Sequence, residues 1–427
     1  MTLPARRHRL SSAQLTDIAW GRPDARAVQV LYDAEDSRLR LLTAEALRRS
    51  RPAGPAVLDA LVVLQAAQRR DDRAVTDLLR LDWLGPWATD LLGRRPGAAR
   101  QAATRLGALA AVAALRTGID ARLAVEVTGG VLHLPGTGTL TIDHPDTEAV
   151  LEARGGRLDV TVGSRRLRLP TMSAPGWSPA RTIQDGALHL LVDDQHPGRD
   201  CFREPPAPPL PEPVFRRWHD LITAAWRLLS RVAPQPAGRV AQGVRVIVPL
   251  ADPPHGIDTS ISCVEALGAV ATTTPSDPAL FAVTLVHEWS HSLLNGMLSF
   301  VDLHEPATAL SASYLAPWRP DPRPISGILH GTFAFLAVAE TWQALLADDS
   351  TAERAAAELA LHRLRLAEAL ALLPAAPELT AQGRRFVEIL RRRHTALMDT
   401  PLRPQEVAAA AARLDEQRSV WARQRRS

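Results

Sequence analysis

The sequence contains no lysine, only two cysteines and few aromatic residues, and these shortages exclude several classes of protein. Cys201 and Cys263 are too few for a disulfide framework or a thiolate zinc site, and we interpret both as small buried hydrophobic residues. No stretch reaches the roughly 18 uninterrupted apolar residues that a membrane span needs, and residues 1–8 lack the apolar run of a signal peptide. We therefore expect a cytoplasmic protein that does not interact with a membrane.

The charge pattern argues against nucleic acid as a partner. All 50 basic residues are arginine, and 46 acidic residues leave a formal net charge of +4. The arginines are scattered among acidic residues rather than gathered in one basic block with interleaved aromatic residues. With 427 residues, of which 46% are hydrophobic and 22% charged, the chain has the composition of a globular protein that can bury a large core.

The texture of the sequence divides the chain into five regions, which we expect to form one integrated body. Leu- and Ala-rich helical patterns fill residues 1–120, and short alternating runs predict a small antiparallel sheet over residues 121–200. A proline-rich connector over 201–213 should run extended. The metal-site core should occupy 214–347, and helices should return over 348–427. The predicted fold class is therefore α+β, predominantly α-helical with a small antiparallel β-sheet.

The clearest chemical signal is the HExxH run of His287, Glu288 and His291, in an apolar helix that Asp277 and Pro278 should begin. Histidines four residues apart share one helix face, so both imidazoles can bind one ion at roughly 2.0 to 2.2 Å. Glu288 lies one position round, where it can transfer protons or hold a ligand. A buried hydrogen-bonded cluster is the alternative, although a metal would better offset the cost of burying these polar groups.

Neither familiar zinc-peptidase pattern supplies a third ligand. Leu294 and Met297 stand where the metzincin motif has glycine and histidine, which excludes that branch. Thermolysin-like enzymes carry an aspartate four residues after the ligating glutamate, and none follows Glu305 or Glu340 at that distance. A zinc-dependent metallopeptidase with Glu288 as general base therefore remains only as the alternative hypothesis.

A proline-rich loop with two arginines follows the metal helix and leads into another helix, which we expect Ser326 to begin. Arg319 and Arg323 lie in this loop, and His330 falls in the first turns of the next helix. An arginine pair beside a metal suits a dicarboxylate better than a peptide bond. Two solvent-facing arginines and one hydrogen-bonded histidine are the alternative interpretation.

These residues and their surroundings resemble the HEXXH-motif domain proteins found beside bacterial peptide natural-product clusters. That family is similar to α-ketoglutarate-dependent HExxH-type peptide β-hydroxylases. The resemblance rests on residues 285–294, 317–319, 321–324 and 329–331, with further likeness over 9–21, 192–200 and 247–250. It departs from the family at Trp289 and Ser290, where relatives often carry an aromatic residue and then Gln. The resemblance implies Fe(II), α-ketoglutarate and O₂, and hydroxylation of a β-carbon in a ribosomally synthesised precursor peptide.

The resemblance also implies a role for each candidate residue. His287, His291 and His330 would ligate iron on one face and leave the other positions for the keto acid and O₂. Arg319 or Arg323 would clamp the distal carboxylate of α-ketoglutarate with a two-pronged pairing. Beside an iron ion, Glu288 changes from a general base to a residue that takes or delivers protons or holds a metal ligand in place.

Alternatives remain for the third metal ligand, for one acidic turn and for the class of function. Asp302 and Glu340 are carboxylate substitutes for His330 as the third ligand. The turn of Asp193, Asp194 and His196 either faces the site or is an ordinary solvated turn. A non-catalytic peptide-binding scaffold with a vestigial site is a third hypothesis beside the two enzymes.

Overall fold

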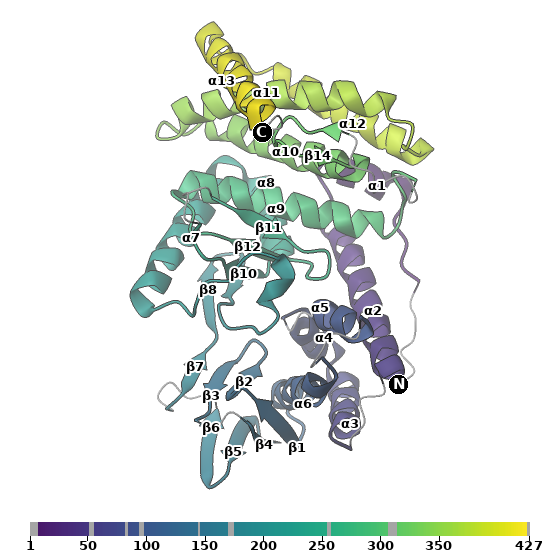
Figure 1. The fold of residues 1–427 in the computed structure, drawn as a ribbon, viewed down its shortest axis with the longest axis vertical. Coiled ribbons are helices and arrows are strands. Elements are labelled where there is room, and N and C mark those ends of the chain that lie inside the picture. Colours follow the sequence, from purple (N-terminus) through teal and green to yellow (C-terminus); the bar gives the residue numbers. More distant parts are fainter. Residues whose placement is uncertain are drawn as a thin grey trace.

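The computed structural model describes residues 7–50, 55–81, 84–93, 98–143, 146–169, 175–253, 258–305 and 314–424. Within these residues the fold is α+β and predominantly α-helical with small antiparallel sheets, as the sequence predicts (Figure 1). No helix in the described ranges combines the length and the apolar character that crossing a membrane requires.

Helices fill the amino-terminal region, as predicted. They are α1 (Ser12–Ala19), α2 (Ala25–Ser50), α3 (Pro55–Arg70), α4 (Asp72–Leu81), α5 (Leu84–Leu92) and α6 (Ala98–Thr117). A capping box begins α1, because the Ser11 hydroxyl accepts from the backbone N–H of Gln14 while the Gln14 side chain accepts from the N–H of Ser11. The apolar face of α6 packs against the first sheet and builds a hydrophobic core with α3 to α5.

Two antiparallel sheets form the part of the molecule that lies lowest in Figure 1. The four-stranded sheet contains, in order, β1 (Ala121–Thr128), β4 (Asp146–Arg154), β5 (Arg157–Val162) and β6 (Arg165–Leu169). The three-stranded sheet contains β2 (Val131–Leu134), β3 (Gly138–Thr141) and β7 (Trp177–Pro179). Gly155 and Gly156 both have positive φ in the tight turn between β4 and β5, which favours glycine there.

A third, mixed sheet lies between this part and α9 (Pro278–Leu298), the helix with the HExxH run, and it differs from the predicted arrangement (Figure 1). Its order is β11 (Ser260–Ser262), β12 (Ala269–Thr272), β10 (Val246–Pro249), β9 (Leu188–Val192) and β8 (Arg181–Asp185). The sequence placed residues 188–192 in the small antiparallel sheet, whereas β9 also pairs in parallel with β10. Leu190, Leu191 and Val192 are all buried, and a strand covered on both faces is typical of a parallel sheet.

The proline-rich connector runs extended beside this sheet only as far as Pro211. It follows the short 3₁₀ helix η1 (Arg199–Phe202), and the Ala207 N–H donates to the Pro249 carbonyl at 2.9 Å. Helix α7 (Glu212–Val232) then begins inside the predicted connector, because proline is tolerated in the first turn of a helix. Helix α8 (Pro234–Gly243) leads into β10.

Two long helices, α9 (Pro278–Leu298) and α10 (Ile325–Leu345), pack side by side near the middle of the molecule (Figure 1). The Asp277 side chain caps α9 by accepting from the Leu280 N–H at 2.9 Å, which confirms the predicted start of the helix with the HExxH run. Helix α10 begins one residue before Ser326. Beyond α10 lie α11 (Ala352–Leu372), η2 (Leu373–Ala375), α12 (Ala381–Met398) and α13 (Pro404–Gln424).

Candidate metal centre

The two histidines of the HExxH run project from α9 toward α10 and converge. The Nε2 atoms of His287 and His291 lie 3.1 Å apart, and the two rings meet nearly at a right angle, 85°. The four-residue spacing puts both rings on one helix face, as predicted. Most of the other side chains of α9 are buried, so the helix is fixed against the sheet and its neighbours.

The separation of the two nitrogens fits one shared ion. Two metal–nitrogen bonds of about 2.1 Å whose ends lie 3.1 Å apart enclose an angle of about 95°. Both imidazoles could therefore reach one ion from the same face of α9.

Both rings are neutral at physiological pH and can offer a lone pair. Burial lowers the pKa of His287 to about 4, and burial is also the main cause that lowers the pKa of His291 to about 4. A metal ligand has to be deprotonated, so no proton has to be displaced from Nε2 when the tautomer is Nδ1–H. The alternative for a contact of this length is a hydrogen bond in which one Nε2 carries the proton.

His330 lies beside this pair, and we call these three residues the histidine cluster. Its ring stacks on His291 with centroids 5.8 Å apart and planes 25° apart. Burial, with the neighbouring His291 and His304, lowers the pKa of His330 to about 3. Lone pairs lie in the ring planes, so two nearly parallel stacked rings do not aim at one point. Within the described part of the chain, no three His, Cys, Asp or Glu side chains form a group that could hold an ion. His330 as third ligand stays a prediction and requires rotation of its ring.

The Glu288 side chain lies between His287 and strand β11 of the mixed sheet. Its side chain is 2% exposed, and Oε1 accepts a hydrogen bond of 2.7 Å from the Ser260 hydroxyl of β11. The same Oε1 lies 3.9 Å from His287 Nε2. The carboxyl group is therefore close to the place where a metal would sit, but it is already held by the strand.

The two carboxylate substitutes lie apart from the histidine cluster. Glu340 accepts two hydrogen bonds of 2.9 Å from Arg393, whose side chain is 1% exposed. It is also ten residues beyond His330 on α10, a rise of about 15 Å. Asp302 is exposed, and its backbone carbonyl accepts from Thr380. The structure brings neither carboxylate to the histidines.

The arginine loop is a short hairpin of β13 (Tyr314–Leu315) and β14 (Pro322–Arg323) before α10. Arg319 Nε donates to Asp321 at 2.6 Å, and Arg323 Nε lies 3.3 Å from the other oxygen of the same carboxylate. The two arginine side chains are 42% and 37% exposed. Both guanidinium groups therefore have a carboxylate partner already, with which a dicarboxylate ligand would have to compete.

Aromatic side chains close one side of the site. The Phe335 ring lies 5.0 Å from both His287 and Trp318, measured between centroids, and 5.2 Å from His362. Gly331 permits this packing, because a Cβ there would lie 2.1 Å from Cζ2 of Trp318. The resulting wall keeps water away from one side of His287.

Sequence reasoning missed three neighbours of the site. Ser260 on β11 and His362 on α11 are distant in the chain and follow no motif spacing. His362 is buried, burial lowers its pKa to about 3, and its Nδ1 has no hydrogen-bond partner among the described residues. His304 Nδ1 is likewise buried without a partner in the described ranges. An unexplained histidine near an HExxH run is the one signal that the sequence offered.

The acidic turn after β9 is buried rather than solvated, because Asp193, Asp194 and His196 are all at most 5% exposed. Asp193 Oδ1 accepts from the backbone N–H groups of Gln195 and His196, while Asp194 pairs with Arg181. The Leu210 N–H also donates to Asp194 at 2.6 Å, which fastens the extended connector. This turn therefore joins the sheet to the connector.

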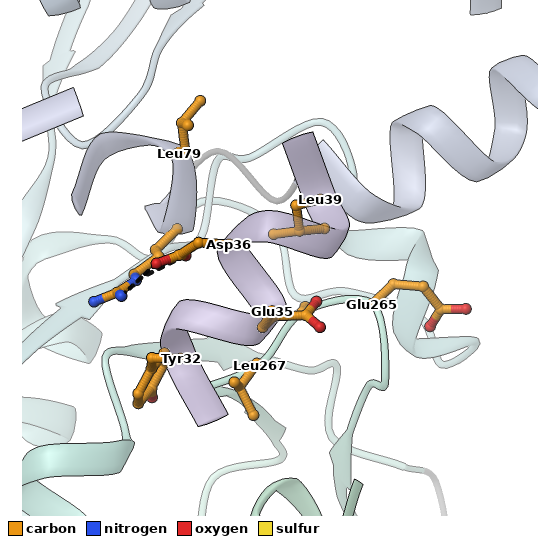
Figure 2. Close-up of a pocket in the computed structure, with 9 residues that line it drawn as sticks. Tyr32, Glu35, Asp36, Leu39, Leu79, Glu265 and Leu267 are labelled. Atoms are coloured by element: carbon orange, nitrogen blue, oxygen red, sulfur yellow. Dashed lines mark hydrogen bonds and ion pairs between the residues drawn. The ribbon is translucent and has the colours of Figure 1, made fainter. Parts of the chain in front are cut away.

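A small pocket beside α2 contains no member of the histidine cluster. Figure 2 shows the residues that line it, which are Tyr32, Glu35, Asp36, Leu39, Leu79, Arg80, Glu265, Ala266 and Leu267. Two of its acidic groups are paired with arginine: Arg80 donates to Asp36 at 3.0 and 2.5 Å, and Arg38 to Glu35 at 2.7 and 2.6 Å. The third, Glu265, accepts a hydrogen bond from the Cys263 thiol at 2.9 Å.

Comparison with known proteins adds no relative. No protein-family model matches the chain, and no curated protein matches it.

Proposed function

We propose that this protein is an Fe(II)- and α-ketoglutarate-dependent dioxygenase that hydroxylates the β-carbon of a residue in a ribosomally synthesised precursor peptide. The observation that carries the proposal is the pair of neutral imidazoles on α9, whose Nε2 atoms lie 3.1 Å apart. Two neutral imidazoles on one helix face would supply two of the three protein groups of a facial iron site, which leaves positions open for the co-substrates. The family resemblance of the HExxH run and the arginine loop supplies the co-substrate and the peptide.

Each residue of the site would have a distinct task. His287 and His291 would hold the metal, and His330 would join them after its ring turns away from the stack on His291. When bound, iron would support the reaction of O₂ in which a C–H bond is replaced by C–OH while α-ketoglutarate loses its carboxyl group as CO₂ and becomes succinate. Arg319 or Arg323 would bind the distal carboxylate of the keto acid and share it with Asp321.

Residues around the metal would exclude water from the site and hold the Glu288 side chain in one orientation. Phe335 and Trp318 would exclude water from the side of the metal site next to His287. The Ser260 hydroxyl holds the Glu288 carboxyl group in one orientation, from which it can accept a proton or orient a metal-bound group.

One observation favours a second candidate, a zinc-dependent metallopeptidase. Glu288 Oε1 lies 3.9 Å from His287 Nε2, close enough to accept a proton from a water molecule on a shared metal. In that case the bound metal would be zinc, the peptide would be cleaved rather than oxidised, and O₂ would not be needed.

The test is α-ketoglutarate turnover coupled to a peptide. Purified protein, Fe(II), α-ketoglutarate and the peptide encoded by a neighbouring reading frame should give succinate and hydroxylated peptide in equal amounts. His287→Ala should abolish both products, whereas His219→Ala, an exposed histidine of α7, should leave both unchanged. Succinate formation that His287→Ala does not reduce, or peptide cleavage with zinc alone, would overturn the proposal.

A further inference from the structure

Strand β11 forms one edge of the mixed sheet, and its register shows which backbone groups face outward. It pairs antiparallel with β12, with Ser260 opposite Thr272 and Ile261 opposite Ala271. The Thr273 N–H donates to the Thr259 carbonyl, so residue 259 forms a hydrogen-bonded pair and residue 261 forms the next one. The N–H and C=O groups of Ser260 and Ser262 therefore point away from β12.

These four backbone groups have no strand beside them among the residues that the structure describes. Groups of the same kind repeat about 6.7 Å apart along a strand, which is the spacing that another extended chain matches. Three residues are too short to hold a second copy of this protein by themselves, because stable dimers bury far larger surfaces. An extended peptide that is also held at a neighbouring site needs no such area.

The side chains of β11 connect this edge to the metal helix. Ser260 points to the α9 face of the sheet, where its hydroxyl donates to Glu288 at 2.7 Å. Ile261 points to the opposite face and packs in the core with β10 and β12. A chain paired with the outer edge would thus pass next to Glu288, whose Oε1 is 3.9 Å from His287 Nε2.

We propose that the substrate peptide docks as an added strand on β11, with its backbone hydrogen-bonded to Ser260 and Ser262. This inference rests on the proposed action on a peptide. The residue that pairs with Ser260 is then the one nearest the histidine cluster. Because the contacts are to the peptide backbone, docking tolerates many side chains, and the site selects which residue reacts.

Hydrogen exchange of the Ser260 and Ser262 amides tests the docking directly in the full chain. The probe is a pool of acetylated, amidated octapeptides with randomised side chains, compared with the same pool methylated at every backbone nitrogen. At nine-tenths occupancy both amides should exchange about tenfold more slowly, since exchange then occurs only from the free fraction. The methylated pool, which cannot donate to a strand, should have no effect.

Substitution of Ser262 supplies a matched pair of variants. Ser262→Pro removes an outward N–H but leaves the ladder to β12 intact, and proline is tolerated on an edge strand in this orientation. We expect Ser262→Pro to weaken binding of the unmethylated pool at least fivefold with an unchanged melting temperature. Ser262→Ala keeps the N–H and should bind like the unsubstituted protein.

Several outcomes would overturn the docking inference. They are equal protection by both pools, equal binding by the two variants, or concentration-dependent protection without peptide, which would make a second copy the occupant. The proposed function fails separately: protection without any α-ketoglutarate turnover keeps the docking and removes the oxygenase. Turnover of the precursor peptide without protection of either amide removes only the docking.

Discussion

Replacing Ser260 by alanine removes the hydrogen bond of 2.7 Å that its hydroxyl donates to Glu288. The Glu288 side chain is 2% exposed, so water cannot readily replace the lost donor. Leaving a buried acceptor without its donor costs roughly 1 to 3 kcal/mol. We therefore expect Ser260→Ala to lower the free energy of unfolding by about 2 kcal/mol.

Guanidinium unfolding of the metal-free protein, followed by tryptophan fluorescence, measures this change as a shift of the midpoint at constant slope. Ser262→Ala is the matched control, because it makes the same substitution on the same face of the same strand. It should change the free energy of unfolding by less than about 0.5 kcal/mol. A double-mutant cycle with Glu288→Ala should assign about 1.5 kcal/mol or more of the loss to the Ser260–Glu288 pair.

Equal effects of Ser260→Ala and Ser262→Ala would refute this reasoning. So would full additivity of Ser260→Ala and Glu288→Ala, because independent effects mean that the two side chains do not interact. In either case the Ser260 hydroxyl would not hold Glu288, and β11 would not be connected to α9 through this hydrogen bond.

Three further predictions follow from the packing and the buried charges. Gly331→Ala should lower the free energy of unfolding by about 2 to 4 kcal/mol and weaken metal binding, since the new Cβ would lie 2.1 Å from an indole carbon. Gly238→Ala on α8 meets open space and should raise the free energy of unfolding by about 0.5 to 1 kcal/mol. Chemical unfolding and metal titration of both variants check these effects. Glu340→Ala should lower the free energy of unfolding by about 3 to 5 kcal/mol, because it leaves the buried Arg393 without its carboxylate partner. The metal affinity of the folded variant should be unchanged. A loss of metal binding without a loss of stability would instead make Glu340 a ligand. The pKa values of His287, His291 and His330 are lowered to about 4, 4 and 3, so below pH 6.5 the unfolded chain binds more protons than the folded one. The metal-free protein should therefore lose stability as the pH falls toward 4, by about 1 kcal/mol per histidine between pH 7.5 and 5.5. Unfolding midpoints that do not change over that pH range would contradict this prediction.

Local patterns predicted those parts of the fold that depend on neighbours in the sequence. The Asp277–Pro278 start of α9 and the i, i+4 convergence of His287 and His291 follow from helix geometry alone, and the structure confirms both. Alternation also predicted the strand 188–192, but its partner β10 is more than fifty residues away. Parallel pairing across that distance leaves no local signature, so the sheet to which β9 belongs was predicted wrongly.

The candidate site likewise contains residues that local spacing predicted and residues that it did not. The two histidines come from one helix turn, whereas Ser260 and His362 reach the site from β11 and α11 by tertiary packing, which a single sequence does not encode in its spacing. Arg319 and Arg323 lie in the predicted loop, but their shared partner Asp321 was not foreseen. The carboxylate substitute Glu340 was plausible from residue type, and only the structure shows that Arg393 occupies it.

The central claim is that O₂ supplies an oxygen atom to the peptide, and labelling with ¹⁸O₂ tests it most directly. The purified protein is incubated with Fe(II), α-ketoglutarate and the precursor peptide under ¹⁸O₂, and the masses of the peptide and of succinate are measured by mass spectrometry. The oxygenase account predicts one ¹⁸O atom in the hydroxylated peptide, a gain of about 18 daltons, and one in succinate. Peptide cleavage that proceeds without O₂ and takes its oxygen from water would contradict the account and establish the hydrolase.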